Sequence, residues 1–110
     1  MPKKDENKKK VSKIFMPWNF EKEQAWLEEM AQDGWLLEKT FFNYTFVKAE
    51  PQEMVYRVDY FSITNEKKME EYKTVFEESG WEFVHSSIGW HYFRIPKSEY
   101  KTDIYSDTPS

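Results

Sequence analysis

Few residues in this sequence have the chemistry of a catalytic or metal site. His85 and His91 are its two histidines, and it has no cysteine. A zinc site needs three or four ligands at defined spacing, which two histidines on a strand-like stretch do not supply. Ser86 and Ser87 stand in no nucleophile-elbow context, and the sequence has no glycine-rich phosphate loop. We therefore expect a protein that is not an enzyme and that holds no metal and no cofactor.

One acid and one base lie close enough in sequence to act together. Arg57 and Asp59 are two positions apart in the alternating stretch Met54 to Phe61, so a strand would place both on one face. There they would form an ion network within the sheet, or the Asp59 carboxylate would meet a cationic ligand. The sequence leaves both interpretations open. Among its 20 acidic residues it indicates no pair of catalytic carboxylates.

Aromatic side chains are the most informative feature, at 19% of the chain. An alternating pattern of aromatic, aromatic and base occurs twice, 46 positions apart. Its members are Tyr44, Phe46 and Lys48, and then Trp90, Tyr92 and Arg94. Alternation places each triplet on one face of a strand. We expect this face to bind a ligand, with Glu38 and Asp59 as nearby acids that would favour a cation through charge and cation–π contacts. The alternative is that the aromatic side chains are ordinary core.

Two similar stretches of chain must position these side chains. Each has apolar residues at helical spacing and ends in Gly-Trp, at Gly34 and at Gly80. Asn19 stands where the N-cap of the first helix is expected, and Thr64 or Asn65 where that of the second is expected. Two strand-like runs follow each helix, and turns near residues 42 and 88 would give both hairpins one register.

In that register, one face of the hairpins meets the helices and the other carries the aromatic pattern. The helix-facing residues would be Trp35, Leu37, Val47 and Ala49, with Trp81, Phe83, Phe93 and Ile95 as their counterparts. The predicted fold class is therefore α+β, with duplicated β-α-β-β units. Two helices would pack on one face of a mainly antiparallel sheet of six to seven strands.

Charge and composition predict one soluble domain with a basic tail. The first ten residues carry five lysines against two acids, whereas the whole chain has a formal net charge of −4. We expect residues 1–11 to be a disordered tail, residues 12–107 to form one domain with a repeat of 13–50 in 54–97, and residues 108–110 to be a disordered end. The acidic body argues against nucleic acid as a partner. No apolar run is long enough to cross a bilayer, so we expect a cytoplasmic protein.

The sequence resembles the bacterial domain-of-unknown-function family 2812. The resemblance rests on FEKEQAWLEEMAQDGW, YTFVKAEP, YRVDY, SGWEFV, WHYFR and TDIYSD, and covers roughly Lys13 to Asp107. It implies no assigned activity. It implies a bacterial protein whose relatives often continue into hydrophobic C-terminal segments and often neighbour PadR-type regulators. The chain would then be a short member or the soluble part of a longer, membrane-anchored protein.

Two functions follow from the aromatic face. The first is a non-enzymatic sensor or binding domain for a hydrophobic, cationic small molecule. The second is a protein-interaction module, in which another protein chain or a second copy of this one covers the face. A pocket would be concave with one or two acids inside, whereas an interaction surface would be flat and exposed.

Overall fold

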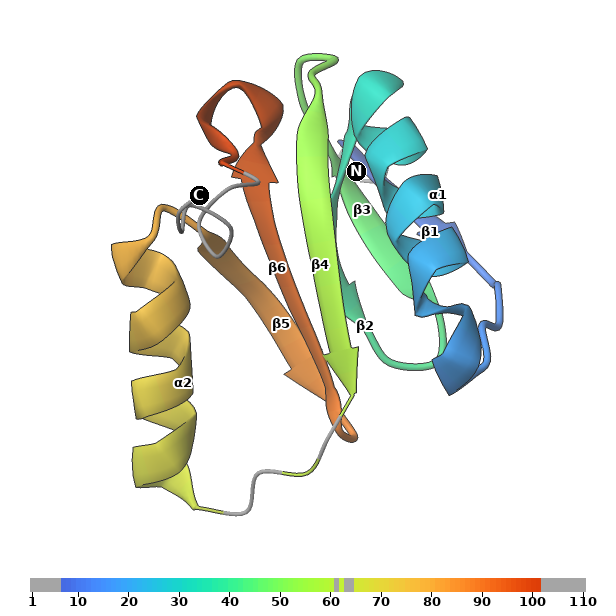
Figure 1. Ribbon diagram of the computed structural model, residues 1–110. Coiled ribbons are helices and arrows are strands. Elements are labelled where there is room, and N and C mark those ends of the chain that lie inside the picture. The colour runs from blue at the N-terminus through green and yellow to red at the C-terminus, as the bar shows by residue number, and fades with distance from the viewer. Residues whose placement is uncertain (1–6, 61, 63–64, 102–110) are drawn as a thin grey trace.

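The computed structural model describes residues 7–60, 62 and 65–101, and these form two helices and two three-stranded antiparallel sheets (Figure 1). The strand order is β1-β3-β2 in the first sheet and β4-β6-β5 in the second. The first sheet comprises β1 (Lys8–Val11), β2 (Trp35–Thr40) and β3 (Tyr44–Lys48). The second comprises β4 (Met54–Tyr60), β5 (Glu82–Ser87) and β6 (Trp90–Pro96). The α+β class is confirmed, but one sheet of six to seven strands is not.

The two long helices have the ends that the sequence indicates. Helix α1 spans Phe20–Gln32 and α2 spans Glu66–Glu78, with short 3-10 helices at Pro17–Asn19 and Lys97–Glu99. Gly34 and Gly80, just beyond α1 and α2, have φ angles of 92° and 96°, which favour glycine. The Asn65 side chain accepts hydrogen bonds from the backbone N–H groups of Lys67 and Lys68, whereas Asn19 makes no such cap. Neither long helix combines the length and apolar character needed to cross a membrane.

Helix α1 lies between the sheets and covers the free edge of β4. The N–H groups of Tyr56 and Val58 donate to Glu28 Oε2 at 3.0 Å and to Gln24 Oε1 at 2.9 Å. These amides are on the side of β4 away from β6, so the helix side chains take the place of a further strand. Leu27 and Ala31 of the same helix are fully buried against both sheets.

Helix α2 covers the other face of the second sheet. Its Phe76 ring stacks on Phe93 with centroids 4.5 Å apart, and Tyr72 meets Phe93 edge-on at 5.4 Å. Phe93 lies on the face opposite to Val58 and Tyr92, which belong to the core around α1. The expectation of two helices on one face is therefore wrong, because α1 and α2 lie on opposite sides of the second sheet (Figure 1).

Hairpin turn length explains why the predicted faces are only partly right. Both hairpins have an irregularity at the corresponding place, between Leu37 and Lys39 and between Phe83 and His85. The β2–β3 turn has three residues between Thr40 and Tyr44, whereas Ile88 and Gly89 alone join β5 to β6. One residue of difference turns every side chain of the return strand to the other face.

The shift changes which aromatic residues meet which helix. The predicted register placed Leu37 and Val47 on the same face. In the structure Leu37 is paired with Phe46 instead, so Tyr44 and Phe46 face α1. There the Trp26 ring meets them edge-on at 4.9 and 5.5 Å. In the second hairpin Phe83 does lie opposite Phe93, as expected, and both face α2. Trp35 and Trp81 are half-buried rather than core residues.

The N-terminal assignments also change. Lys8–Val11 form strand β1 on the edge of the first sheet, not a disordered tail. The expected β-α-β-β unit at 13–50 has no strand ahead of its helix, since residues 13–16 contain no regular element before the 3-10 helix that begins at Pro17. The last residues of the expected domain, 102–107, and the expected end at 108–110 lie outside the described residues, as do residues 1–6. The duplication of the chain is not confirmed.

Candidate functional site

The structure places the predicted aromatic residues inside the molecule rather than on an open face. Tyr44, Phe46 and Tyr92 are 8%, 0% and 3% exposed, in the core that both sheets share with α1. Trp90 is half-buried beside this core. The residues of the pattern therefore do come together, but from two different sheets that face each other.

The predicted acids do not join them. Glu38 lies at the irregularity of β2, where its Oε1 is 3.1 Å from Lys8 Nζ. Asp59 faces α2, and its Oδ2 accepts from Arg57 Nε at 3.1 Å and from the Tyr72 hydroxyl. Arg57 and Asp59 thus form the ion pair that the sequence allowed, on the opposite side of the sheet from Tyr92.

A different acid, Glu23 of α1, meets the aromatic residues. Its side chain is 1% exposed, and the hydroxyls of Tyr44 and Tyr92 both donate to its Oε2, each at 2.7 Å. Its other oxygen, Oε1, is buried and has no hydrogen-bond partner within the described residues. A buried polar atom without a partner is uncommon and costs free energy, so Glu23 Oε1 is a candidate contact for a ligand.

The electrostatics of this group follow from its burial. Desolvation raises the pKa of the Glu23 carboxyl, and the two tyrosine hydrogen bonds lower it by a smaller amount. Burial and the neighbouring Glu23 also raise the pKa of both tyrosines, which therefore stay protonated as donors. Burial therefore disfavours the charged form of Glu23 in the free protein.

A hollow of about 250 Å³ lies at this point, at the end of the molecule where both hairpins turn. Tyr44, Trp90, Tyr92 and Glu23 line it together with Lys13 and Phe15. Residues of the two turns complete the lining: Thr40, Phe41, Phe42, Asn43, Ser87 and Ile88, with Ile14. Small-molecule pockets usually occupy roughly 300–1,000 Å³, so this one suits a small ligand.

The aromatic rings at the hollow already hold one cation. Lys13 Nζ lies 5.4 Å from the centroid of Phe15 and 4.7 Å from that of Trp26. Phe15 and Trp26 in turn pack on Tyr44, at 6.4 and 4.9 Å. The faces of such rings attract ammonium groups, so this cluster has the chemistry to bind a cationic ligand.

The two histidines are separate from this site. His91 is buried, and its Nδ1 is 2.8 Å from Ser86 Oγ, while His85 Nε2 lies 2.9 Å from the Thr40 carbonyl oxygen. No group of three or more histidine or acidic side chains in the described part of the chain is placed to hold a metal ion.

A larger hollow, about 460 Å³, lies between the two helices over β4. Three of the polar side chains that line it are engaged. Gln24 and Glu28 cap β4, and Asp59 is bound by Arg57 and Tyr72. A ligand in the larger hollow would be held mainly by the fit of its shape. A ligand in the hollow at Glu23 could also pair with the buried Oε1 atom.

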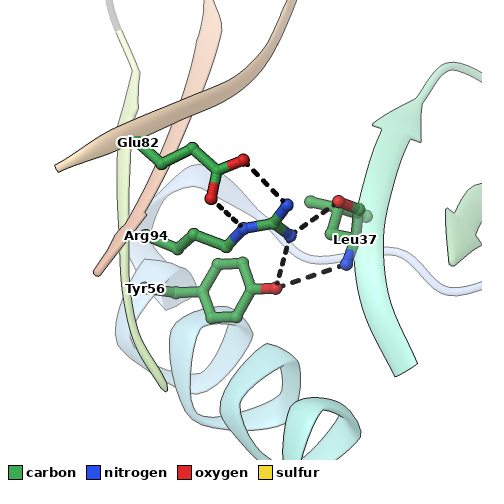
Figure 2. A network of polar contacts seen from close by, with 4 residues as sticks. All are labelled: Leu37, Tyr56, Glu82 and Arg94. Atoms are coloured by element: carbon green, nitrogen blue, oxygen red, sulfur yellow. Dashed lines mark hydrogen bonds and ion pairs between the residues drawn. The ribbon is translucent and has the colours of Figure 1, made fainter. Parts of the chain in front are cut away.

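Arg94, which the aromatic pattern places beside Tyr92, is structural. Figure 2 shows its guanidinium between Glu82, Tyr56 and the backbone of Leu37. Nη1 donates to the Leu37 carbonyl oxygen at 2.8 Å and to the Tyr56 hydroxyl at 3.2 Å, and Nε donates to Glu82 at 3.0 Å. These bonds join the second sheet to the first, and Arg94 is only 9% exposed.

Glu23 was not predicted as a site residue, although its position among the apolar residues of the helix indicates that it is buried. It is three residues after Phe20 and four before Leu27, on the stripe that also holds Ala31. An acid on the apolar face of a helix is unusual because burying a charge is costly. Acids also favour the first turn of a helix because they are attracted to the helix N-terminus. The position of Glu23 in that turn therefore explains its presence without burial.

The fold and the hollow define a small α+β domain with a buried carboxylate at an aromatic pocket. The chain belongs to the family described as protein of unknown function (DUF2812), whose model matches residues 19–110. This confirms the resemblance seen in the sequence motifs. No curated protein and no solved structure matched the chain.

Proposed function

We propose that the chain is a non-enzymatic binding or sensor domain for a small hydrophobic cation. The ligand enters the hollow between the two hairpin turns and lies against Trp90, Tyr44 and Tyr92. Its positive charge is paired with the Glu23 carboxylate. Of the two functions expected from the sequence, this is the binding domain with a concave pocket. Glu23 is the acid that pairs with the cation, a role first assigned to Glu38 and Asp59.

The observation that carries the proposal is the unpartnered Oε1 of Glu23. Two tyrosine hydroxyls already donate to one oxygen of the carboxylate, and the other oxygen has no donor among the described residues. A cationic ligand with an N–H would supply that donor. A quaternary ammonium would supply charge alone, and the rings around it would contribute cation–π attraction of about 0.5–2 kcal/mol each.

The binding test uses benzyltrimethylammonium, a small permanent cation, and follows tryptophan fluorescence and heat on titration. Neopentylbenzene, its uncharged carbon analogue, separates charge from shape. We expect the cation to bind at least tenfold more tightly than the neutral analogue at pH 8. Glu23→Gln should remove most of that difference, because it keeps the shape of the side chain and removes its charge.

Glu29→Gln is the matched control, since Glu29 is an exposed acid on the same helix. It should leave the affinity unchanged. Lys13→Met should tighten binding, because it removes a like charge at the hollow. Equal affinities of wild type and Glu23→Gln for the cation, with both proteins folded, would contradict the proposal.

The affinity should also depend on pH in one direction. The ligand binds the ionised carboxylate, and the pKa of Glu23 is raised in the free protein. Lowering the pH through that raised pKa protonates Glu23 and should weaken binding, whereas Glu23→Gln should show no such dependence.

Two further expectations from the sequence, about the location of the protein and the origin of its fold, are also proposed. One is a cytoplasmic location, which the absence of cysteine supports. The other is an internal duplication, supported by the corresponding irregularities in the two hairpins and by the positive φ angles of Gly34 and Gly80.

A further inference from the structure

Most of the exposed apolar side chains of the described residues gather at one end of the molecule. Ten large apolar side chains are exposed, and eight of them belong to this end. They are Ile14, Met16, Trp18, Phe20, Phe41, Phe42, Tyr60 and Ile88. Ile14, Phe41, Phe42 and Ile88 line one hollow, and Trp18, Phe20 and Tyr60 line a neighbouring one. Figure 1 shows both hairpin turns, the end of β4 and the start of α1 at the bottom of the view.

The most exposed side chains on the two turns contribute little to the stability of the fold. Phe42 and Ile88 are 85% and 80% exposed, and each stands in a turn. Ile88 also has a φ of 47°, a conformation that glycine and asparagine adopt readily and that strains a β-branched residue. A turn built for stability would have a different residue there, so the apolar side chain points to a role outside the fold.

Residue types at this end are ordered by depth. The four side chains on the turns and the preceding loop, Ile14, Phe41, Phe42 and Ile88, are pure hydrocarbon and 68–88% exposed. Tyr60 pairs with Trp90 at the strand ends behind the turns, and Trp18 lies beside Tyr60. Hydrocarbon at the tip and amphipathic aromatics behind it match the change in polarity across the surface of a bilayer.

Lysines stand next to the turns. Lys39 is two residues before Phe41, Lys13 lines the hollow between the turns, and Lys10 lies opposite Thr45 near the same end of the first sheet. All three are exposed. Glu21 and Glu66, in the first turns of the helices that begin here, offset part of this charge. The cations therefore suit lipid phosphates beside Phe41 and Phe42, and apolar insertion supplies most of the attraction.

We propose that this end of the molecule docks on the surface of an anionic lipid bilayer. Phe41, Phe42, Ile88 and Ile14 enter the boundary between headgroups and acyl chains, while Lys13 and Lys39 meet lipid phosphates. The domain lies on the membrane and does not span it. In this orientation the hollow at Glu23 opens toward the lipid.

Vesicle sedimentation with the full chain tests the docking. The vesicles contain phosphatidylcholine alone or with about one third phosphatidylglycerol. The wild type should bind the anionic vesicles at least fivefold more tightly than the neutral ones. Changing Phe41 and Phe42 together to Ser should weaken binding about tenfold or more, because two inserting rings are lost.

Three variants separate docking from folding and from ligand binding. Val75→Ser removes an exposed apolar side chain on α2, away from the turns, and should leave vesicle binding unchanged. Ile88→Asn should weaken vesicle binding while keeping or raising the unfolding temperature. Glu23→Gln should bind vesicles as the wild type does, since docking does not depend on the cation site.

Three results would overturn the docking proposal. The first is a wild type that ignores both kinds of vesicle. The second is a loss of vesicle binding in Val75→Ser as large as in the Phe41 and Phe42 double variant. The third is a lipid-free dimer, measured by analytical ultracentrifugation, that this double variant dissociates, because a second copy of the chain would then cover the apolar end.

Discussion

At the scale of single residues, Glu23 is the exception that gives the site its chemistry. A fully buried carboxyl is rarely placed among aromatic rings without a cation, because desolvation penalises its charged form. Here two tyrosine hydroxyls stabilise one oxygen, and the other oxygen has no partner in the described residues. When it is ionised, the Glu23 carboxylate therefore destabilises the folded protein in the absence of a ligand. A bound cation would offset this cost.

This predicts a pH dependence of stability that Glu23→Gln removes. The pKa of Glu23 is raised in the folded protein, so between its unfolded and folded values the folded state binds more protons. Its stabilising contribution is full below the unfolded pKa and is lost as pH rises through the folded one. Each unit of difference corresponds to about 1.4 kcal/mol.

Urea denaturation from pH 4 to pH 9 measures this effect. The unfolding free energy of the wild type should fall relative to that of Glu23→Gln as pH rises. Glu29→Gln should follow the wild type. Parallel curves for wild type and Glu23→Gln would show that Glu23 has no raised pKa in the folded state.

At the scale of elements, turn length decides what each hairpin can do. The three-residue turn of the first hairpin presents Tyr44 and Phe46 to α1. The two-residue turn of the second presents Phe93 to α2, and so sends Tyr92 toward the interior. Two hairpins of similar sequence thus contribute the same kind of aromatic residue to one core from opposite sides.

The two-residue turn should be easy to stabilise. Ile88 and Gly89 have φ angles of 47° and 84°, the pattern of a type I′ turn, in which Asn-Gly is favoured. Ile88→Asn should raise the unfolding free energy by about 1 kcal/mol, since a left-handed conformation costs most L-residues roughly 1–2 kcal/mol.

Chemical denaturation beside Phe42→Asn provides the comparison. Phe42 is equally exposed, but a positive φ among the described non-glycine residues occurs at Ile88 alone. Phe42→Asn should therefore change stability by less than Ile88→Asn does. A loss of stability in Ile88→Asn would mean that the isoleucine packs in solution.

At the scale of the whole molecule, a few polar contacts join the sheets where they meet. The Tyr56 hydroxyl accepts from the Leu37 N–H at 3.2 Å, while Arg94 donates to the Leu37 carbonyl oxygen (Figure 2). The irregularity of β2 beside Leu37 leaves these two backbone groups for the other sheet. These hydrogen bonds connect the two sheets directly.

Removing this connection should cost far more than removing a surface ion pair. Arg94→Met should lower the unfolding free energy by about 2–3 kcal/mol, because hydrogen bonds to a buried charged group are lost and Leu37 is left unpaired. Lys8→Met, which breaks the exposed pair with Glu38, should cost about 0–1 kcal/mol. Thermal and urea unfolding of both variants give the comparison, and equal losses would argue that Arg94 does not join the sheets.

The sequence by itself determined the local structure of this protein. Helix α1 and helix α2 end where Gly34 and Gly80 allow a positive φ, and Asn65 caps α2. The strand Met54–Tyr60 follows from its alternation. These features depend on neighbouring residues, whose preferences act over a few positions and are visible in the order of side chains.

The tertiary structure alone decided which faces meet and which acid lies between them. One residue of difference in turn length divided the expected single face between two helices, and alternation cannot reveal such a shift. Lys8–Val11 became a strand because β3 offered a free edge, not through any strand pattern in its lysines. Glu23 meets the aromatic side chains because Tyr44 and Tyr92 converge on it from sequence distances of 21 and 69 residues. Contacts over such distances depend on packing, which the periodicity of a single segment does not record.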